Sequence, residues 1–156
     1  FVEAGWLKYN VEAGKVWGTL PFPLMQIMPG NESFYHDDYA FNLMNYYEFI
    51  ADEYIAYHLI YHMEGLFLNR IPAIRKLKWR EVVQFKGVAG HSTEQNRLYN
   101  QLPAGAYFFS KPYLEAGAGI ENIFRVFRVD AVWRLSYNDH PNIKPFGIMF
   151  SMNFDF

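Results

Sequence analysis

The residues best suited to chemistry are histidines and carboxylates between positions 48 and 64. His58 and His62 are four positions apart, a spacing at which two imidazoles on one face of a helix can share a metal ion. Several carboxylates near them would complete such a site: Glu48, Asp52, Glu53 and Glu64. On a strand, the same two histidines would lie about 13 Å apart, too far for one ion. A metal site therefore depends on whether this segment is a helix.

Other patterns for catalysis are weak. Ser92 follows His91 directly, but neighbouring residues of a strand point to opposite faces. The sequence has no G-x-S-x-G motif, and Gly117-Ala-Gly119 is not followed by a dinucleotide-binding pattern. The chain has no Cys, which excludes disulfides, thiolate metal sites and a Cys nucleophile. We therefore expect a protein that is not an enzyme, with no catalytic residue, no cofactor and no bound metal.

Residues 39–64 fit two secondary structures. Alternating residues share one face over 41–49 and again over 55–63, with a turn at 51–53, which predicts a β-hairpin. Ile55, Leu59 and Met63 would instead form an apolar stripe on a helix. Tyr, Ile and Phe favour strands, so the hairpin is the preferred prediction. The alternative is a soluble helical metal-binding protein.

The last eleven residues alternate without interruption. One face is apolar and consists of Phe146, Ile148, Phe150, Met152, Phe154 and Phe156. About ten residues is the length that a tilted strand needs to cross a bilayer. On a soluble protein, an exposed terminal strand of this kind would promote aggregation. These six residues are typical of the terminal strand of a bacterial outer-membrane barrel, where they act as the assembly signal.

The whole composition is compatible with this fold class. The chain is 51% hydrophobic and 20% aromatic, yet no apolar run approaches the length of a transmembrane helix. Alternation predicts about seven strands, at 5–14, 41–49, 55–63, 82–89, 112–121, 128–137 and 146–156. Single-chain bacterial barrels have an even number of strands, so at least one more strand must come from elsewhere. We expect an all-β chain, the incomplete C-terminal part of an antiparallel, up-and-down transmembrane β-barrel.

The chain begins without an initiator Met or a secretory signal. We therefore expect residues 1–156 to be the C-terminal portion of a barrel domain whose N-terminal part is missing. If the last strand runs from the outside to the periplasm, the links at 138–145, 91–111 and 51–53 are extracellular. Those at 122–125, 66–79 and 19–38 are then periplasmic, and a helical turn is expected after Pro72. Two long periplasmic links depart from the usual pattern of short periplasmic turns.

The face opposite the apolar one carries charges. A hairpin turning at 122–125 would place Gly119 opposite Arg128 and Gly117 opposite Asp130, which leaves room for both long side chains. The hypothesis is a luminal polar network of Glu115, Arg128, Asp130 and Arg134. The alternative is that these are ordinary solvated positions. An inward-facing Trp133 would overturn the hypothesis.

Several motifs are similar to an uncharacterised outer-membrane family. They are Phe41-Asn-Leu-Met-Asn-Tyr-Tyr-Glu-Phe49, Gly65-Leu-Phe-Leu-Asn-Arg-Ile-Pro72, Arg75-Lys-Leu-Lys78, Tyr113-Leu-Glu-Ala-Gly117, Gly119-Ile-Glu-Asn-Ile123, Arg128-Val-Asp-Ala-Val-Trp-Arg-Leu135 and Phe146-Gly-Ile148. Members of that family carry an N-terminal carboxypeptidase-regulatory-like domain followed by a large C-terminal barrel. The last three strands also loosely resemble BamA-type surface-antigen barrels, but the lid signature of those barrels, an Arg-Gly followed by an aromatic, is absent.

The resemblance and the patterns together predict a non-enzymatic, integral outer-membrane protein of Gram-negative bacteria. Its expected partners are outer-membrane lipids, the barrel-assembly machinery and upstream strands of its own chain. A formal charge of -2 gives no reason to expect nucleic acid. The alternative in another class is a barrel that transports a substrate or that assembles or translocates proteins.

Overall fold

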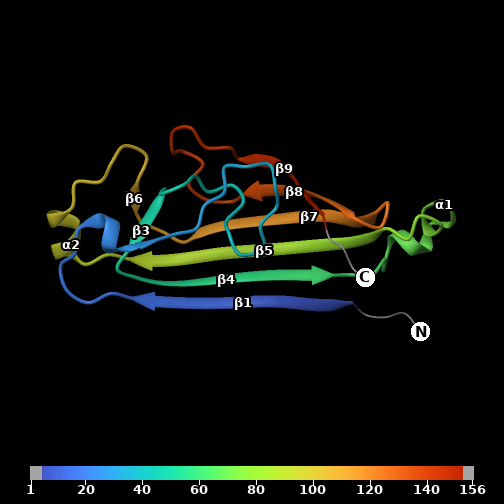
Figure 1. Cartoon of the computed structure of the whole chain (residues 1–156), viewed down its shortest axis with the longest axis horizontal. Helices are drawn as coiled ribbons and strands as arrows, with labels where there is room; N and C mark the ends of the chain where they lie inside the picture. Colours follow the sequence, from blue (N-terminus) through green and yellow to red (C-terminus); the bar gives the residue numbers. More distant parts are fainter. Residues whose placement is uncertain (1–4, 153–156) are drawn as a thin grey trace.

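The computed structural model describes residues 5–152, and in this part the chain is all-β (Figure 1). Six long strands form one antiparallel sheet in the order β1-β4-β5-β7-β8-β9. They are β1 Trp6–Lys15, β4 Glu53–His62, β5 Arg80–His91, β7 Tyr113–Ile123, β8 Phe127–Arg134 and β9 Phe146–Met152. In residues 5–152, no helix has both the length and the apolar character that a membrane span requires.

The remaining elements are short and lie in the connections. A second sheet joins β2 Gln26–Ile27, β3 Phe49–Ala51 and β6 Tyr107–Phe108. The helical turns are η1 Phe22–Leu24, η2 Leu68–Arg70, α1 Pro72–Arg75 and α2 Glu94–Tyr99. The helical turn that was expected after Pro72 is confirmed as α1, whose first residue is this proline.

One row of the pairing register shows how the sheet sorts its side chains. Tyr9 faces Leu59, which faces Phe85, and the row continues through Ala116 and Trp133 to Phe146 on β9. Since side chains of paired residues lie on the same face, the whole row shares the outer face of the sheet. Alternate residues along each strand therefore give one apolar outer face and one largely polar inner face.

The large sheet is open. β1 and β9 each pair with one long strand, so each leaves an outer edge. The edge of β9 is occupied at one point: Phe150 N–H donates to the carbonyl of Phe34, and Phe150 O accepts from His36 N–H at 2.7 Å. A segment that comes from the connection between β1 and β4 thus protects part of the last strand.

The strand predicted at 41–49 is wrong. Residues 41–48 are turns and coil, β3 begins only at Phe49, and Tyr47 has a positive φ of 60° that a strand does not adopt. Phe41, Leu43 and Met44 are all buried, so the segment buries side chains of both parities instead of showing one face. The strand predicted at 55–63 is confirmed as β4, which pairs with β1 on one side and with β5 on the other, so the alternative helix is wrong. The long sheet therefore has six strands where seven were expected.

This correction changes the predicted topology. Residues 16–52 form a single connection that starts and ends at the same end of the sheet as the connections 92–112 and 135–145. We call this the α2 end; the α1 end holds the connections 63–79 and 124–126 (Figure 1). The links 19–38 and 66–79 had been expected at the same end of the sheet. They lie at opposite ends, so this expectation is wrong. Three long connections now share one end, which is closer to the usual barrel pattern.

The core lies between the inner face of the sheet and residues 28–48 of the long connection. Phe41 and Phe49 each pack against Tyr113 of β7, and Met28, Met44 and other buried side chains surround them. Because the covering segment is coil, many of its backbone groups need polar partners. The inner face of the sheet supplies these partners.

Candidate functional site

The candidate functional site is the inner face of the sheet with the segment that covers it. One line of polar contacts begins at β8, where Arg128 makes a bidentate ion pair with Asp130 at 2.7 and 2.8 Å. Both side chains are almost fully buried. Asp130 Oδ1 also accepts from Gln84 Nε2, and Gln84 Oε1 lies 2.8 Å from His36 Nε2. The contacts thus cross the sheet from β8 to β5 and then reach the covering segment.

The strand between β8 and β5 has glycines where these side chains pass. A Cβ at Gly119 would lie 2.5 Å from Asp130 Oδ1 and 2.7 Å from the carbonyl oxygen of Val129. A Cβ at Gly117 would lie 2.6 Å from Gln84 Nε2. Gly119 thus leaves room for Asp130, one of the two side chains expected beside these glycines, whereas Gly117 leaves room for Gln84 of β5.

The predicted pairing of these glycines is wrong. Gly119 faces Asp130, not Arg128, and Gly117 faces Val132, not Asp130. The register shifts between Ile120 and Ile123, where the two strands are irregularly paired. A bulge of this kind adds a residue to one strand. The prediction assumed regular pairing outward from the turn at 122–125 and therefore missed the added residue.

The same line of contacts continues to the edge strand β1. Asp38 Oδ1 lies 3.3 Å from His36 Nδ1, and Asp38 Oδ2 accepts from Lys8 Nζ at 2.6 Å. Burial alone would raise the pKa of the Asp38 carboxyl group, but the contacts with His36 and Lys8 outweigh burial and hold that pKa below its ordinary value. Asp38 is therefore ionised and ties the covering segment to β1.

A second set of contacts lies near the α2 end. Arg134 binds both carboxylate oxygens of Glu48, at 3.0 and 2.5 Å, and also donates to the carbonyl oxygen of Leu43. Its guanidinium lies over the ring of Tyr113, and His140 Nδ1 lies 3.0 Å from Glu48 Oε1. Burial favours the neutral form of Glu48, but the contacts with Arg134, the backbone of Asn45 and His140 together outweigh burial and lower the pKa of the Glu48 carboxyl group. The pair is buried and fully hydrogen-bonded.

Two more charged residues bind the backbone of the covering segment. Lys86 of β5 is fully buried and donates to the carbonyl oxygens of Asp37 and Ala40, at 2.5 and 2.7 Å. Glu115 of β7 is also fully buried and accepts from the backbone N–H groups of Asn42 and Leu43. The strands thus hold a coil segment by satisfying backbone groups that no sheet pairs.

The four residues predicted as one network form two separate groups in the structure. Arg128 and Asp130 pair with each other, whereas Glu115 and Arg134 face each other across the strands but bind the covering segment. Trp133 is 44% exposed on the opposite face, so the inward orientation of all four is as expected. The missed members on the strands are Lys8, Gln84 and Lys86, which share the polar parity and were detectable. The partners in the covering segment could not be detected from the sequence, because they lie in coil. They are His36, Asp38, Asn42 and Glu48.

The histidines that suggested a metal site have other roles. His62 Nδ1 lies 2.9 Å from Glu121 Oε2, and the ring of Trp6 stacks on His62 at 3.9 Å. His58 packs against Phe41 on the same face. Within residues 5–152, no three His, Asp or Glu side chains converge so that they could hold a metal ion.

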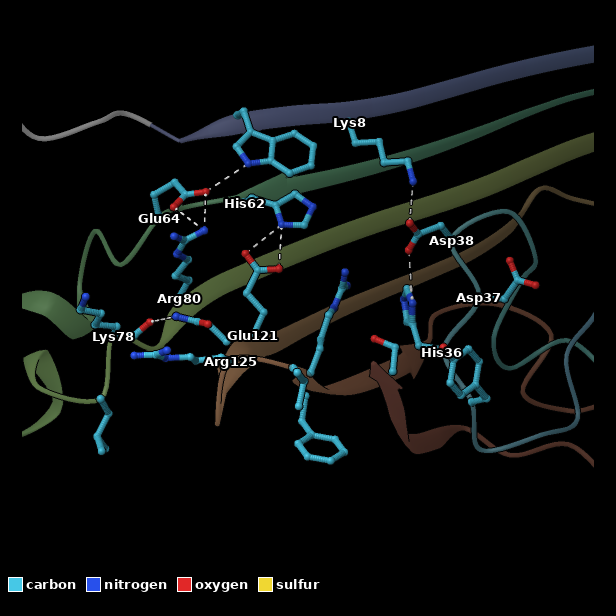
Figure 2. A pocket seen from close by; sticks show the side chains of 18 of the residues that line it. Lys8, His36, Asp37, Asp38, His62, Glu64, Lys78, Arg80, Glu121 and Arg125 are labelled. Atoms are coloured by element: carbon cyan, nitrogen blue, oxygen red, sulfur yellow. Dashed lines mark hydrogen bonds and ion pairs between the residues drawn. The ribbon is translucent and has the colours of Figure 1, made fainter. Parts of the chain in front are cut away.

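A groove of about 950 Å³ opens on the inner face near the α1 end (Figure 2). Three of its carboxylates are in ion pairs: Glu64 with Arg80, Glu121 with His62, and Asp38 with Lys8. The fourth, Asp37, accepts from the backbone N–H groups of Tyr39 and Ala40. The groove is also lined by cations from the connections at this end. It is larger than the hollow of about 290 Å³ that Asn31, Leu43 and Asn142 line nearer the α2 end.

The outer face is opposite in character. Phe146, Ile148, Phe150 and Met152 of β9 are each between 42% and 47% exposed, whereas Met149 and Ser151 are buried. Phe154 and Phe156, the other predicted members of the assembly signal, lie outside the described residues. The rest of the outer face is equally apolar: Leu7, Tyr9, Val11 and Ala13 of β1; Ile55, Tyr57, Leu59 and Tyr61 of β4; Val83, Phe85, Gly87 and Ala89 of β5; Leu114, Ala116, Ala118 and Ile120 of β7; Phe127, Val129, Ala131 and Trp133 of β8.

Comparison with known proteins gives a family and no function. No curated protein and no solved structure matches the chain. The model of the C-terminal domain of a family of unknown function, DUF5686, matches residues 1–105 of the 156. This agrees with the expected similarity to an uncharacterised family. The chain therefore belongs to the DUF5686 family, within its C-terminal domain.

Proposed function

We propose that this chain is the C-terminal part of a non-enzymatic transmembrane β-barrel in the bacterial outer membrane. The observation that carries the proposal is the outer face of the six-stranded sheet. Between the ends of the strands this face has no charged residue, although it is the face that no other described element covers. Soluble monomers rarely expose a continuous apolar surface of this extent.

The ends of the apolar band support a membrane environment. On the outer-face parity, Lys, Arg, Asp, Glu and His occur only at strand ends: Lys15, Glu53, Glu81 and His91. Glu81 and His91 bound the band on β5 and lie about 33 Å apart along the strand, at about 3.3 Å per residue. For a strand tilted by about 40°, this is roughly 25 Å along the bilayer normal, the height of the apolar band of outer-membrane barrels.

The inner face supports closure of the sheet. Buried charges such as Lys86 and Glu115 need partners that exclude water, and a closed sheet would surround them. The open edges of β1 and β9 are where further strands of the natural protein would add. The covering segment 28–48 would then fill part of the lumen, which favours this proposal over the transport alternative.

Within this proposal, β9 serves as the assembly signal by strand addition at its outer edge. Phe150 N–H donates to Phe34 O and Phe150 O accepts from His36 N–H, and these two bonds occupy part of that edge. Segment 34–36 must therefore move away from β9 before another strand pairs along the whole edge. The edge is protected from aggregation until then.

The test uses the natural protein that carries this chain, expressed in a Gram-negative host whose outer membrane is then isolated. The double variant Ile148→Asp, Phe150→Asp places charges on the outward side of β9. The matched control, Ser151→Asp, places a charge on the inward side of the same strand, where Ser151 faces Arg128. We expect the wild type and the control in the outer membrane after carbonate extraction, and the double variant to be lost from it.

Two results would contradict the proposal. The wild-type protein would be released by carbonate if it did not span the membrane. Equal membrane levels of the double variant and the control would show that the apolar side of β9 has no role in assembly.

A further inference from the structure

The two ends of the sheet carry opposite charge. The connections at the α1 end, 63–79 and 124–126, contain five Lys or Arg and one Glu, a net charge of +4. The connections at the α2 end, 16–52, 92–112 and 135–145, contain seven carboxylates and three cations, a net charge of -4 with neutral His. The chain as a whole is nearly neutral, so this separation is a property of the fold.

The five cations of the α1 end form what we call the basic rim: Arg70, Arg75, Lys76, Lys78 and Arg125. All five are exposed, and none makes an ion pair with any residue in 5–152. The longer connection is tied to the end of β7, because Asn122 Nδ2 donates to the carbonyl oxygen of Lys78 at 2.7 Å. Figure 2 shows Lys78 and Arg125 at the same end of the groove.

The groove beside the rim leaves these cations available. Three of its four carboxylates, Glu64, Glu121 and Asp38, already have cationic or histidine partners, and the fourth, Asp37, accepts from backbone N–H groups. Lys76, Lys78 and Arg125 line the same groove without such a partner among the described residues. The local charge therefore favours an anionic ligand, and phosphate groups are strong acceptors for Lys and Arg.

Exposed apolar side chains alternate with the cations of the rim. Phe124 is 84% exposed beside Arg125, and Leu77, between Lys76 and Lys78, is 51% exposed. Phe67 and Ile71 are also exposed in the longer connection. This apolar surface continues into the outer face through Phe127. These apolar side chains would not contribute to the binding of a soluble phosphate compound. They match the boundary between lipid head groups and acyl chains, where polar and apolar groups meet.

We propose that the basic rim binds the phosphate groups of anionic phospholipids in the leaflet at the α1 end, an inference that rests on the proposed barrel. Lys76, Lys78 and Arg125 contact the head groups, while Phe124 and Leu77 lie among the upper acyl chains. The shorter connections are at this end, which is the periplasmic end in outer-membrane barrels generally. The rim thus fixes the depth and the orientation of the sheet in the membrane.

The test compares lipid preference in two charge-matched variants of the natural protein. The rim variant is Lys76→Gln, Lys78→Gln, Arg125→Gln; the control is Lys15→Gln, Lys111→Gln, Lys144→Gln, at the α2 end. Each protein is placed in vesicles of phosphatidylcholine that contain dansyl-labelled phosphatidylglycerol or dansyl-labelled phosphatidylcholine. Energy transfer from the tryptophans reports which lipid lies beside the protein.

We expect the preference of the wild type for phosphatidylglycerol to fall at least about tenfold in the rim variant, because each cation near a surface contributes separately to binding. The control should keep the wild-type preference. A rim variant that inserts and keeps its preference would overturn this inference and leave the barrel proposal intact. Failure of the wild type to resist carbonate extraction would overturn the barrel proposal instead.

Adding inorganic phosphate distinguishes a site for lipid phosphate groups from a site for soluble phosphate. If millimolar phosphate abolishes the preference and also binds the detergent-solubilised protein without lipid, the rim is a site for soluble phosphate and the lipid assignment is wrong. If added phosphate lowers the preference only as much as an equal ionic strength of chloride does, the assignment to lipid is supported.

Discussion

The two faces of the six-stranded sheet differ more than the faces of an ordinary half-buried sheet do. In a soluble antiparallel sheet, the apolar face packs on the core and the polar face meets water. Here the apolar side chains, such as Phe85 and Trp133, are the exposed ones. The charged side chains, such as Lys86 and Glu115, are fully buried.

Two different kinds of interaction therefore stabilise the two faces of the sheet. The inner face depends on specific partners, because each buried charge there is matched by a carboxylate, a guanidinium or a backbone group. The outer face has no partner in the described chain and depends on its surroundings. Substitutions on the inner face should therefore act through lost contacts, and those on the outer face through the solvent.

The largest effect is expected at the inner ion pair of Arg134 with Glu48. Arg134→Ala leaves Glu48 buried beside the carbonyl oxygen of Leu43, which has also lost its donor. We expect the free energy of unfolding to fall by about 3–5 kcal/mol, measured by urea titration in a neutral detergent. The control Arg125→Ala, at an exposed cation, should change it by less than about 0.5 kcal/mol. Equal losses in the two variants would refute the role of buried pairing.

A charge placed on the outer face tests whether this face meets lipid or water. Ala118 is exposed in the middle of β7, and Ala89 is exposed one step from the end of the apolar band on β5. In lipid, Ala118→Arg should destabilise the protein by about 2–4 kcal/mol and Ala89→Arg by clearly less, because the cost depends on depth. On a surface that faces water, both would be nearly neutral. Unfolding in lipid vesicles measures the difference.

The glycines of the two faces should respond differently to a methyl group. At Gly119 on the inner face, the added Cβ meets the backbone oxygen of Val129 at 2.7 Å and cannot displace it. At Gly87 on the outer face, it meets the hydroxyl end of Tyr57 at 2.5 Å, which can move outward. We expect Gly119→Ala to cost about 1–3 kcal/mol and Gly87→Ala less. The reverse order in urea unfolding would contradict the assigned register.

The smallest effect is a dependence on pH. The lowered pKa of the Glu48 carboxyl group stabilises the fold above its ordinary value of 4.5, and this contribution is lost as the pH falls through the lowered value. The free energy of unfolding should therefore fall as the medium is acidified below about pH 4.5. Glu48→Gln should start lower and fall less steeply. Identical slopes for the two proteins would show that Glu48 has no part in acid sensitivity.

The sequence predicted what depends on alternation. The strands near 5–14, 82–89 and 112–121, the outward Trp133 and the inward Arg134 all follow from a period of two. Alternation also suggested a strand at 41–49, but that segment buries Phe41 and Met44 together under the sheet, and only its tertiary position explains this.

The partners of the inner charges were less predictable. The bulge between Ile120 and Ile123 shifts the register of the β7–β8 pair, and no motif in the sequence predicts this bulge. Lys86 binds carbonyl oxygens and Glu115 binds backbone N–H groups, and such partners have no side-chain signature in a sequence. The polar parity of a strand could be predicted, but not what each polar side chain contacts.

The most direct test of the central claim is a spin-label scan along β7 in the membrane-embedded natural protein. Single cysteines at positions 114, 115, 116, 118 and 120, in a protein freed of any other cysteine, would carry a nitroxide, and collisions with oxygen and with a water-soluble nickel complex would be measured. Positions 117 and 119 are omitted because a side chain at either glycine would clash. We predict that oxygen, which concentrates in lipid, is most accessible at positions 114, 116, 118 and 120, where Leu114, Ala116, Ala118 and Ile120 face outward. Preferential access of the nickel complex to these same positions would show that the outer face meets water and would contradict the account.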